Sequence, residues 1–521
     1  MGKRGAVATS HPLAAQIGIE VLAEGGNAVD AAVAVAAALT VLEPTSNGLG
    51  SDAFAIVWDG KELHGLNASG RSPKGLTLDI MRKHGKMRDG KLTVPTTGWL
   101  PVTVPGAVSA WAALNKRFGS MPLSRLLEPA ARYAEDGHPV PPVIAHYWSF
   151  AEKHFGDNEA FRETFLPQSR AVQAGEIFAC PDQARTLRLI GESEGEAFYR
   201  GELAERIADY AAKTGGYLTK EDLAEHEPEW VDPVSINYRG YDIWEIPPNG
   251  QGIAALIALN ILEGFEMERY PHLSSAHLHL VIEAMKLAFA DVYRYVADPK
   301  FADIPLDGLL SKDYAKKRRS LINPTQALPA PEPGDPLGDT VYLCTADGDG
   351  RMVSFIQSNY MGFGSGVVVP GTGVSLQNRG CGFSLEEGHP NIYAPGKRPF
   401  HTIIPSFITK DGVPLAAFGV MGGDMQPQGH FQVVSSIVDY RLNPQAAIDA
   451  PRVRVLDKGR VAVEPTINPE AVRELARLGH GVQIEQEMAG FGGGQMIWRD
   501  PETGVYIAGS EPRKDGQALA L

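Results

Sequence analysis

The run from Ala28 to Leu42 consists almost entirely of alanine, valine and leucine. We expect it to form a helix, and a helix that is apolar on nearly every side must be buried on most of its surface. A second helix is expected over His11–Ala23, and Glu24-Gly25-Gly26-Asn27 joins the two as a glycine turn. The chain must therefore fold into a body of several layers, with at least one helix in its interior.

The rest of the chain divides into a mainly helical middle, from about Val104 to Tyr314, and a last third that is rich in hairpins. The expected hairpin strands are 53–58 with 62–66, 341–346 with 352–357, and 406–409 with 415–420. Both kinds of region have to bury apolar faces. An α+β body of four layers, with two antiparallel sheets covered by helices (α-β-β-α), meets that need.

The composition excludes several classes of function. A formal net charge of −14 argues against nucleic acid or an anionic membrane as the main partner. Three cysteines provide neither a disulfide framework nor metal-ligand spacing. The residues before His11 contain no apolar signal core, and the most apolar helix is too short to span a bilayer. We therefore expect a cytoplasmic protein.

Thr340 stands where a Pro/Gly/acid stretch, 329–339, meets an apolar strand that begins at Val341. Cleavage before Thr340 would free an α-amine next to its own hydroxyl. Such an amine has a reference pKa of ~7.7–8.0, so it can act as the general base for that hydroxyl near neutral pH. The alternative is an ordinary proline-rich loop that enters a strand beginning with a β-branched residue.

Further candidates follow Thr340 in the sequence. Ser358 ends the return strand of the hairpin and could place its hydroxyl against that of Thr340, and a glycine-dense loop, 359–366, comes next. Gly422 and Gly423 end an apolar strand, where two adjacent N–H groups could form an oxyanion hole. Taken singly, each has an ordinary structural interpretation, as a strand-end serine or a turn.

Three other patterns are weaker. Gly191–Gly195 fits the G-x-S-x-G pattern of serine hydrolases but follows an expected helix end rather than a buried strand. The segment Gly250–Ala255 fits a dinucleotide-binding turn after the expected strand Tyr241–Ile246, although two prolines intervene. His277 and His279 should point to different sides of a helix, which disfavours a metal site.

The chain resembles the γ-glutamyltransferases (γ-glutamyltranspeptidases), a family of N-terminal nucleophile hydrolases. The likeness extends over nearly the whole chain and is carried by His11–Ala14, Gly25–Ala32, Val104–Gly106, Glu283–Asp291, Asp298-Pro299, Gly338–Thr340, Lys397–Pro399 and Gly422-Gly423. It implies a precursor that cleaves itself between Asp339 and Thr340. The products would be a large subunit, 1–339, and a small subunit, 340–521, which together form one structural body.

The resemblance also implies roles for individual residues. Thr340 matches the nucleophile, Ser358 the hydroxyl that orients it, and Gly422 with Gly423 the oxyanion hole. Arg71 matches the arginine that binds the substrate α-carboxylate, a task that suits a guanidinium group.

The chain departs from the glutathione-cleaving members at five positions of the substrate pocket. Tyr360 stands where those members have Asn, and His401 and Thr402 stand where they have a serine pair. Arg379 replaces a Gln, and Gly382 replaces an Asp. Glycine cannot pair with an ammonium group, and a nearby arginine would repel it. We therefore expect acyl groups without the amine, such as glutaryl, to be accepted at least as well as γ-glutamyl. Glu386 or Glu387 could supply the missing acid.

Together these features predict an N-terminal threonine amidohydrolase/acyltransferase that cleaves γ-glutamyl or related short dicarboxylic amides, in the manner of a glutathione hydrolase. Alternatives within the family are a glutaryl (cephalosporin-type) acylase and an oxamate-type amidase. Alternatives of other classes are an NAD(P)-dependent enzyme that uses Gly250–Ala255 and a catalytically silent binding relative. The expected partners are a small-molecule amide and water or an amine as acceptor, with no metal or organic cofactor. The natural acyl donor and the oligomeric state, including a homo-oligomer, stay open.

Overall fold

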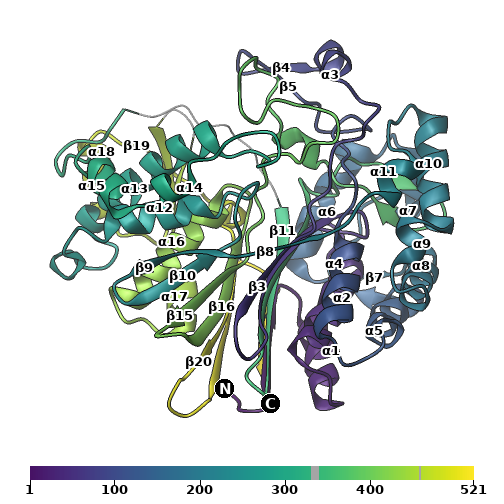
Figure 1. The fold of residues 1–521 in the computed structure, drawn as a ribbon, viewed down its shortest axis with the longest axis horizontal. Coiled ribbons are helices and arrows are strands. Elements are labelled where there is room, and N and C mark those ends of the chain that lie inside the picture. The colour runs from purple at the N-terminus through teal and green to yellow at the C-terminus, as the bar shows by residue number, and fades with distance from the viewer. Residues whose placement is uncertain (330–338, 457–458) are drawn as a thin grey trace.

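The computed structural model describes residues 1–329, 339–456 and 459–521. Two sheets lie face to face in the middle of the molecule, and helices cover the outer face of each (Figure 1). This is the predicted four-layer α-β-β-α arrangement. The proposed cleavage loop upstream of Thr340 falls largely on 330–338, outside the described residues.

The first sheet is antiparallel throughout. In the described part of the chain it has seven strands, in the order β22 (Gln517–Ala520), β1 (Gly5–Thr9), β11 (Asp339–Asp347), β12 (Met352–Tyr360), β2 (Asp52–Trp58), β3 (Leu63–Asn67) and β8 (Glu229–Val231). β11, which carries Thr340, therefore lies between β1, from the start of the chain, and its hairpin partner β12.

The second sheet is also antiparallel. Its described strands follow the order β21 (Tyr506–Ser510), β20 (Gly493–Arg499), β16 (Val413–Met421), β15 (Ser406–Lys410), β10 (Tyr241–Glu245) and β9 (Val234–Tyr238). Smaller pairings join β4 (Lys86–Arg88) with β5 (Lys91–Thr93), β6 (His138–Pro139) with β7 (Ile177–Phe178), β13 (Val368–Val369) with β14 (Val374–Ser375), and β17 (Val453–Val455) with β18 (Arg460–Val463) and β19 (Gly481–Ile484).

The two helical layers come from different parts of the chain (Figure 1). On the side of the first sheet lie α1 (Pro12–Ala23), α2 (Ala28–Leu42), α4 (Ala107–Phe118), α5 (Leu123–Asp136), α6 (Pro142–Phe155), α7 (Glu159–Phe165), α8 (Pro181–Glu192), α9 (Glu196–Tyr199), α10 (Glu202–Thr214) and α11 (Lys220–Ala224). On the side of the second lie α12 (Ile253–Leu262), α13 (Ser275–Tyr295), α14 (Leu306–Leu309), α15 (Lys312–Arg319), α16 (Met425–Val438), α17 (Pro444–Asp449) and α18 (Pro469–Arg477). α3 (Leu78–His84) lies beside β4 and β5, at the top of the view.

Helix α2 spans the predicted range, and each of its residues is buried. Asn27 caps it, accepting hydrogen bonds from the N–H groups of Val29 and Asp30, while the Asp30 carboxylate accepts one from Asn27 N–H. This reciprocal cap starts the helix directly after the glycine turn. No helix in the described ranges is both long enough and apolar enough to cross a membrane.

The core between the two sheets depends on one close approach. The ring of Tyr342 in β11 lies against Gly419 in β16, where a Cβ atom would come within 2.4 Å of the ring carbon Cε2. Glycine is therefore required at position 419 for the sheets to pack at this point. The Tyr342 hydroxyl is hydrogen-bonded to Ser354 Oγ at 2.7 Å, so its polar end is also satisfied.

Candidate active site

Thr340 lies near the start of β11, in a register shift against β12 that falls between Asp339 and Val341. A shift of this kind re-aims the side chain at the irregular position. The Thr340 hydroxyl is buried and donates a hydrogen bond to Ser358 Oγ at 3.1 Å. Gln426 Nε2 donates to the same hydroxyl oxygen at 3.5 Å. The two hydroxyls therefore meet, as the hairpin pattern predicted.

Ser358 is fixed from two sides. It lies in β12 opposite Asp52 of β2, and its Oγ accepts a hydrogen bond from Tyr360 N–H at 2.7 Å. Tyr360 has a positive φ of 80°, an uncommon conformation for a non-glycine residue that turns the chain back toward Ser358. The strand end thus holds the serine hydroxyl in place beside Thr340.

Gly422 and Gly423 connect the end of β16 to the first turn of α16. Their φ angles are 122° and 58°, in the region that favours glycine. Neither N–H donates a hydrogen bond to another described residue. The glycine pair lies at the N-terminal end of a helix, where the backbone favours negative charge, so the arrangement suits an oxyanion. That role remains a prediction.

Arg379 is completely buried, and its Nη1 donates to Thr402 Oγ1 at 2.7 Å. Its guanidinium carbon lies 4.1 Å from the centre of the Tyr360 ring. Burial lowers the pKa of Arg379 to about 10, so the side chain is still a cation at neutral pH. Its Nε and Nη2 have no hydrogen-bond partner within the described part of the chain. A buried cation with two unused donors is suited to bind an anionic ligand group.

His401, next to Thr402, points toward Asp52, with Nε2 3.0 Å from Asp52 Oδ2. Burial raises the pKa of Asp52 to about 6, and burial together with Arg379 holds the pKa of His401 well below its usual value. Asp52 also accepts a hydrogen bond from Gly70 N–H at 2.9 Å. His401 and Asp52 are therefore hydrogen-bonded to each other.

Arg71 lies in a different environment from the one its predicted role requires. Its Nη1 donates to Asp298 Oδ2 at 2.9 Å, and its Nη2 donates to Glu229 Oε1 at 3.3 Å. A substrate carboxylate would have to compete with both of these acids. The role assigned to Arg71 from the resemblance stays a prediction, and Arg379 has the donors that Arg71 lacks.

Glu386 and Glu387, the acids of the neighbouring segment, are each paired with a basic side chain. Glu386 is half-exposed and lies 3.5 Å from the Lys91 ammonium, while the highly exposed Glu387 lies 3.4 Å from the Arg82 guanidinium. At position 382 a Cβ atom would come 2.5 Å from the carbonyl oxygen of Phe400, so a larger residue would require a local shift.

Sequence reasoning missed Gln251, which connects the segment of Thr402 with the glycine pair. Its side-chain amide donates to Thr402 O at 2.7 Å and to Gly423 O at 3.0 Å. Gln251 belongs to the turn interpreted as a nucleotide motif. That turn follows β10, which pairs antiparallel with both neighbours, whereas a dinucleotide site needs a parallel βαβ unit. The NAD(P) alternative therefore has no support.

The Gly191–Gly195 pattern lies, as expected, at a helix end, because α8 extends to Glu192 and Ser193 Oγ donates back to Leu189 O. The Ser193 hydroxyl is therefore hydrogen-bonded within the end of the helix. A nucleophile elbow requires a strand before the serine, whereas helix α8 precedes Ser193.

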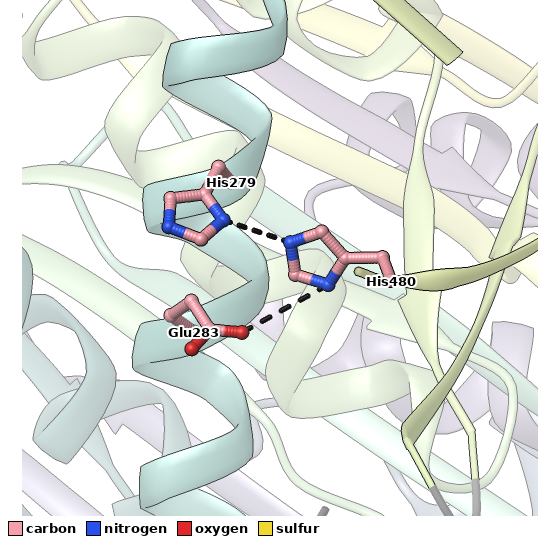
Figure 2. A group of neighbouring side chains, drawn as sticks. All are labelled: His279, Glu283 and His480. Atoms are coloured by element: carbon pink, nitrogen blue, oxygen red, sulfur yellow. Dashed lines mark hydrogen bonds and ion pairs between the residues drawn. The ribbon is translucent and has the colours of Figure 1, made fainter. Parts of the chain in front are cut away.

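A buried histidine cluster lies elsewhere, where α13 meets β19 (Figure 2). His279 pairs with His480, not with His277, and Glu283 lies close to both. His279 Nε2 must donate to the carbonyl of Asn323, so its Nδ1 accepts the proton of His480 Nε2 at 2.8 Å.

The Lys286 ammonium occupies the remaining space in this cluster. It donates to Glu283 Oε1 at 2.8 Å and to His480 Nδ1 at 3.3 Å. A metal ion would have to displace this cation and break the pairing of the two histidines. The cluster is therefore a complete hydrogen-bond network rather than a vacant set of ligands.

A cavity of about 670 Å³ opens beside the candidate catalytic residues. Gly422, Met361 and Asn378 line it on the side of the site. Asn378 directly precedes Arg379, and its side chain accepts a hydrogen bond from Met361 N–H at 3.1 Å. The cavity thus connects the glycine pair with the outside of the molecule.

Comparison with known proteins identifies the group to which this chain is related. The Gamma-glutamyltranspeptidase family matches residues 14–521. The glutathione hydrolase-like YwrD proenzyme of Bacillus subtilis is 38% identical over 100% of this chain and 99% of its own length. The oxamate amidohydrolase proenzyme of Klebsiella pneumoniae is 33% identical over 99% and 98%.

Among solved structures, the cephalosporin acylase from Bacillus halodurans superposes with a TM-score of 0.95 and 54% identity, covering 100% of this chain and 96% of that one. The family match and the structural superposition both extend over the segments before and after Thr340. The chain is an enzyme, a hydrolase or transferase, and belongs to the gamma-glutamyltranspeptidase family of N-terminal nucleophile hydrolases.

Proposed function

We propose that this enzyme is an N-terminal threonine amidohydrolase/acyltransferase whose preferred acyl groups are short dicarboxylic acids without an α-amine. The observation that carries the proposal is Arg379, a fully buried cation with two unused donors. It lies against Tyr360, whose N–H holds the Ser358 hydroxyl. A carboxylate bound at Arg379 would therefore lie close to the reacting hydroxyl.

The first step is self-cleavage. Thr340 Oγ1 attacks the carbonyl carbon of Asp339, and the peptide C–N bond breaks as the Thr340 nitrogen takes the hydroxyl proton. Water then hydrolyses the resulting ester. This leaves a carboxylate at Asp339 and a free α-amine on Thr340, with subunits 1–339 and 340–521.

The substrate reaction uses the same hydroxyl. The α-amine removes the proton from Thr340 Oγ1 while the oxygen attacks the amide carbonyl, and the N–H groups of Gly422 and Gly423 stabilise the oxyanion. The α-amine passes the proton to the departing nitrogen, which leaves an acyl ester on Thr340. Water or an amine then attacks the ester, gives its proton to the α-amine and regenerates the hydroxyl.

The environment of Arg379 favours a carboxylate over an ammonium group. Arg379 contributes a positive charge, Gly382 offers no acid, and Asp52 is already paired with His401. Two like charges within ~4–6 Å disfavour each other in a buried site. Relatives named as an oxamate amidohydrolase and as a cephalosporin acylase are consistent with this preference, whereas relatives named as glutathione hydrolases favour γ-glutamyl as the second candidate.

The test compares kcat/KM for glutaryl-p-nitroanilide and γ-glutamyl-p-nitroanilide. We expect the wild type to accept glutaryl at least as well as γ-glutamyl, and Arg379→Gln to lower kcat/KM for glutaryl by about tenfold or more, since one charged hydrogen bond is lost. Arg71→Gln, in fully cleaved and folded protein, is the matched variant and should change the ratio between the two substrates little. A wild type that prefers γ-glutamyl by more than about tenfold would refute the proposal.

A further inference from the structure

The cavity beside Gly422 has a lining that the acyl pocket does not explain. Aromatic residues line it from three segments of the chain: Tyr147, Phe150 and Phe155 from α6, and the buried residues Phe363, from the loop after β12, and Phe491, from the segment before β20. Rings gathered around an open space of about 670 Å³ fit an apolar or aromatic ligand group.

Phe150 is the most informative of these residues. Its relative exposure is 51%, so half of a large apolar side chain faces solvent within the cavity wall. Isolated exposed apolar residues need no explanation, but an exposed ring that shares a concave wall with the part-exposed rings of Tyr147 and Phe155 is typical of a binding surface.

The position of the cavity suits the amine side of the scissile amide bond. Arg379 and Thr402, which form the proposed carboxylate site, do not line it, whereas Gly422 does. The acyl and amine parts of an amide extend from the carbonyl carbon in opposite directions. With the acyl carboxylate at Arg379 and the carbonyl oxygen at the glycine pair, the amine part is directed into the cavity.

We propose that this cavity binds the amine part of the substrate and that this amine is bulky, largely apolar and aromatic or fused-ring. The inference rests on the proposed function and specifies the other half of its substrate. Pockets of about 300–1,000 Å³ hold drug-sized groups, so ammonia or a small alkylamine would leave most of this volume to water.

Charged groups of both signs also line the cavity. Arg454 donates to Gly490 O at 3.2 Å, and Glu487 lies 3.3 Å from His146. Because the cavity contains cationic and anionic groups together, its lining selects by size and apolar surface rather than by one charge. The aromatic rings are therefore the residues to test.

The same site should accept amines in the reverse direction. A bulky amine held in the cavity would attack the acyl ester on Thr340 with its nitrogen lone pair and pass a proton to the α-amine. The new amide forms as the Thr340 oxygen leaves and takes that proton from the α-amine, which regenerates the hydroxyl. Such an amine should compete with water for the acyl-enzyme at a lower concentration than a small amine of similar basicity.

The experiment uses two amides with the same glutaryl group, one of ethylamine and one of 1-naphthylmethylamine, which are both alkylamine leaving groups. We expect kcat/KM to be about tenfold or more higher for the naphthylmethyl amide, because its ring system is removed from water in the cavity. Phe150→Ala should reduce this advantage several-fold and leave the ethylamide unchanged. Ile177→Ala is the control, since Ile177 is also an exposed apolar residue but lies in β7 and does not line the cavity.

Equal kcat/KM values for the two amides, or an equal effect of Phe150→Ala on both, would overturn the inference while leaving the proposed function intact. If no amide is hydrolysed, the proposed function fails instead. Binding of 1-naphthylmethylamine to the wild type and to Phe150→Ala, measured by calorimetry, then decides the inference by itself. Weaker binding in the variant supports it, and equal or absent binding overturns it.

Discussion

Thr340 Oγ1 donates a hydrogen bond to Ser358 Oγ at 3.1 Å, although eighteen residues separate them in the sequence. The hairpin of β11 and β12 brings the two hydroxyls together, and Ser358 accepts a second hydrogen bond from Tyr360 N–H. Ser358 Oγ thus accepts a hydrogen bond from the Thr340 hydroxyl. We propose that this contact orients Thr340 Oγ1 for attack, while the α-amine takes the proton.

The first prediction is that Ser358→Ala lowers kcat by about 100-fold, since a misplaced nucleophile typically costs that much. The turnover of p-nitroanilide substrates by fully cleaved, folded protein measures this. Ser354→Ala is the control, because Ser354 lies on the same strand and bonds the Tyr342 hydroxyl instead. Equal kcat values in the two variants would contradict the orienting role.

A second prediction concerns Gln251. Gln251→Met keeps a similar volume but removes the donors to Gly423 O and Thr402 O, so we expect the glycine pair to lose its fixed position and kcat to fall by about tenfold or more. Gln183→Met is the matched control, since Gln183 is also buried and its amide donates to Thr40 O away from the site. A loss of activity no larger than that of the control would show that Gln251 only fills space.

A third prediction separates a hydrogen-bond network from a metal site at His480 (Figure 2). His480→Leu removes the hydrogen bonds that His480 makes with His279 and Lys286. We therefore expect the free energy of unfolding to fall by about 1–3 kcal/mol. Urea denaturation measures it. A chelator or added Zn²⁺ should leave the wild-type midpoint unchanged, and a rise in the midpoint with Zn²⁺ would contradict the network interpretation.

The fourth prediction is a loss of stability in acid. Burial lowers the pKa of His11, His226, His277 and His480 to about 3. These groups stay neutral in the folded protein, while the unfolded chain protonates them below about pH 6.5. Their stabilisation is therefore complete above pH 6.5 and is lost as the pH falls from there toward 3, because unfolding takes up protons.

Asp52 acts in the opposite direction, since its raised pKa of about 6 lets the folded state bind one proton before the unfolded state does. The raised pKa values of Glu245, Asp291 and Asp515 act in the same direction as that of Asp52. The lowered pKa values of His138, His272, His389 and His401 add to the effect of the four histidines above, so the histidines together outweigh the carboxyl groups. We expect the urea midpoint to fall steadily between pH 7 and pH 5, and His226→Gln to reduce the slope. A midpoint that is constant or rises over this range would contradict the burial of the neutral histidines.

Local patterns in the sequence predicted the elements that local interactions determine. The largely apolar run of α2 was predicted with the correct bounds. The helix expected to contain His277 and His279 begins at Ser275, where Ser274 Oγ caps it by accepting a hydrogen bond from His277 N–H. The meeting of Thr340 and Ser358 also followed from one hairpin, whose two strands are adjacent in the sequence.

Contacts between distant segments could not be predicted in this way. The sequence did not predict the contact between Arg71 and Asp298, which lie 227 positions apart. Gln251 and Gly423 are 172 residues apart, and their contact depends on how α12 and α16 are placed on the second sheet. The unused donors of Arg379 likewise become visible only when every neighbour of a buried side chain is known.

The most direct test of the account is the mass of each chain after a short reaction with glutaryl-p-nitroanilide and an acid quench. We expect wild-type protein to consist of chains 1–339 and 340–521, with one glutaryl group added to the smaller chain as an ester on Thr340. Thr340→Ala should remain a single uncut chain without the added mass. An uncut wild type that hydrolyses the substrate, or an acyl group on any residue other than Thr340, would contradict the central claim.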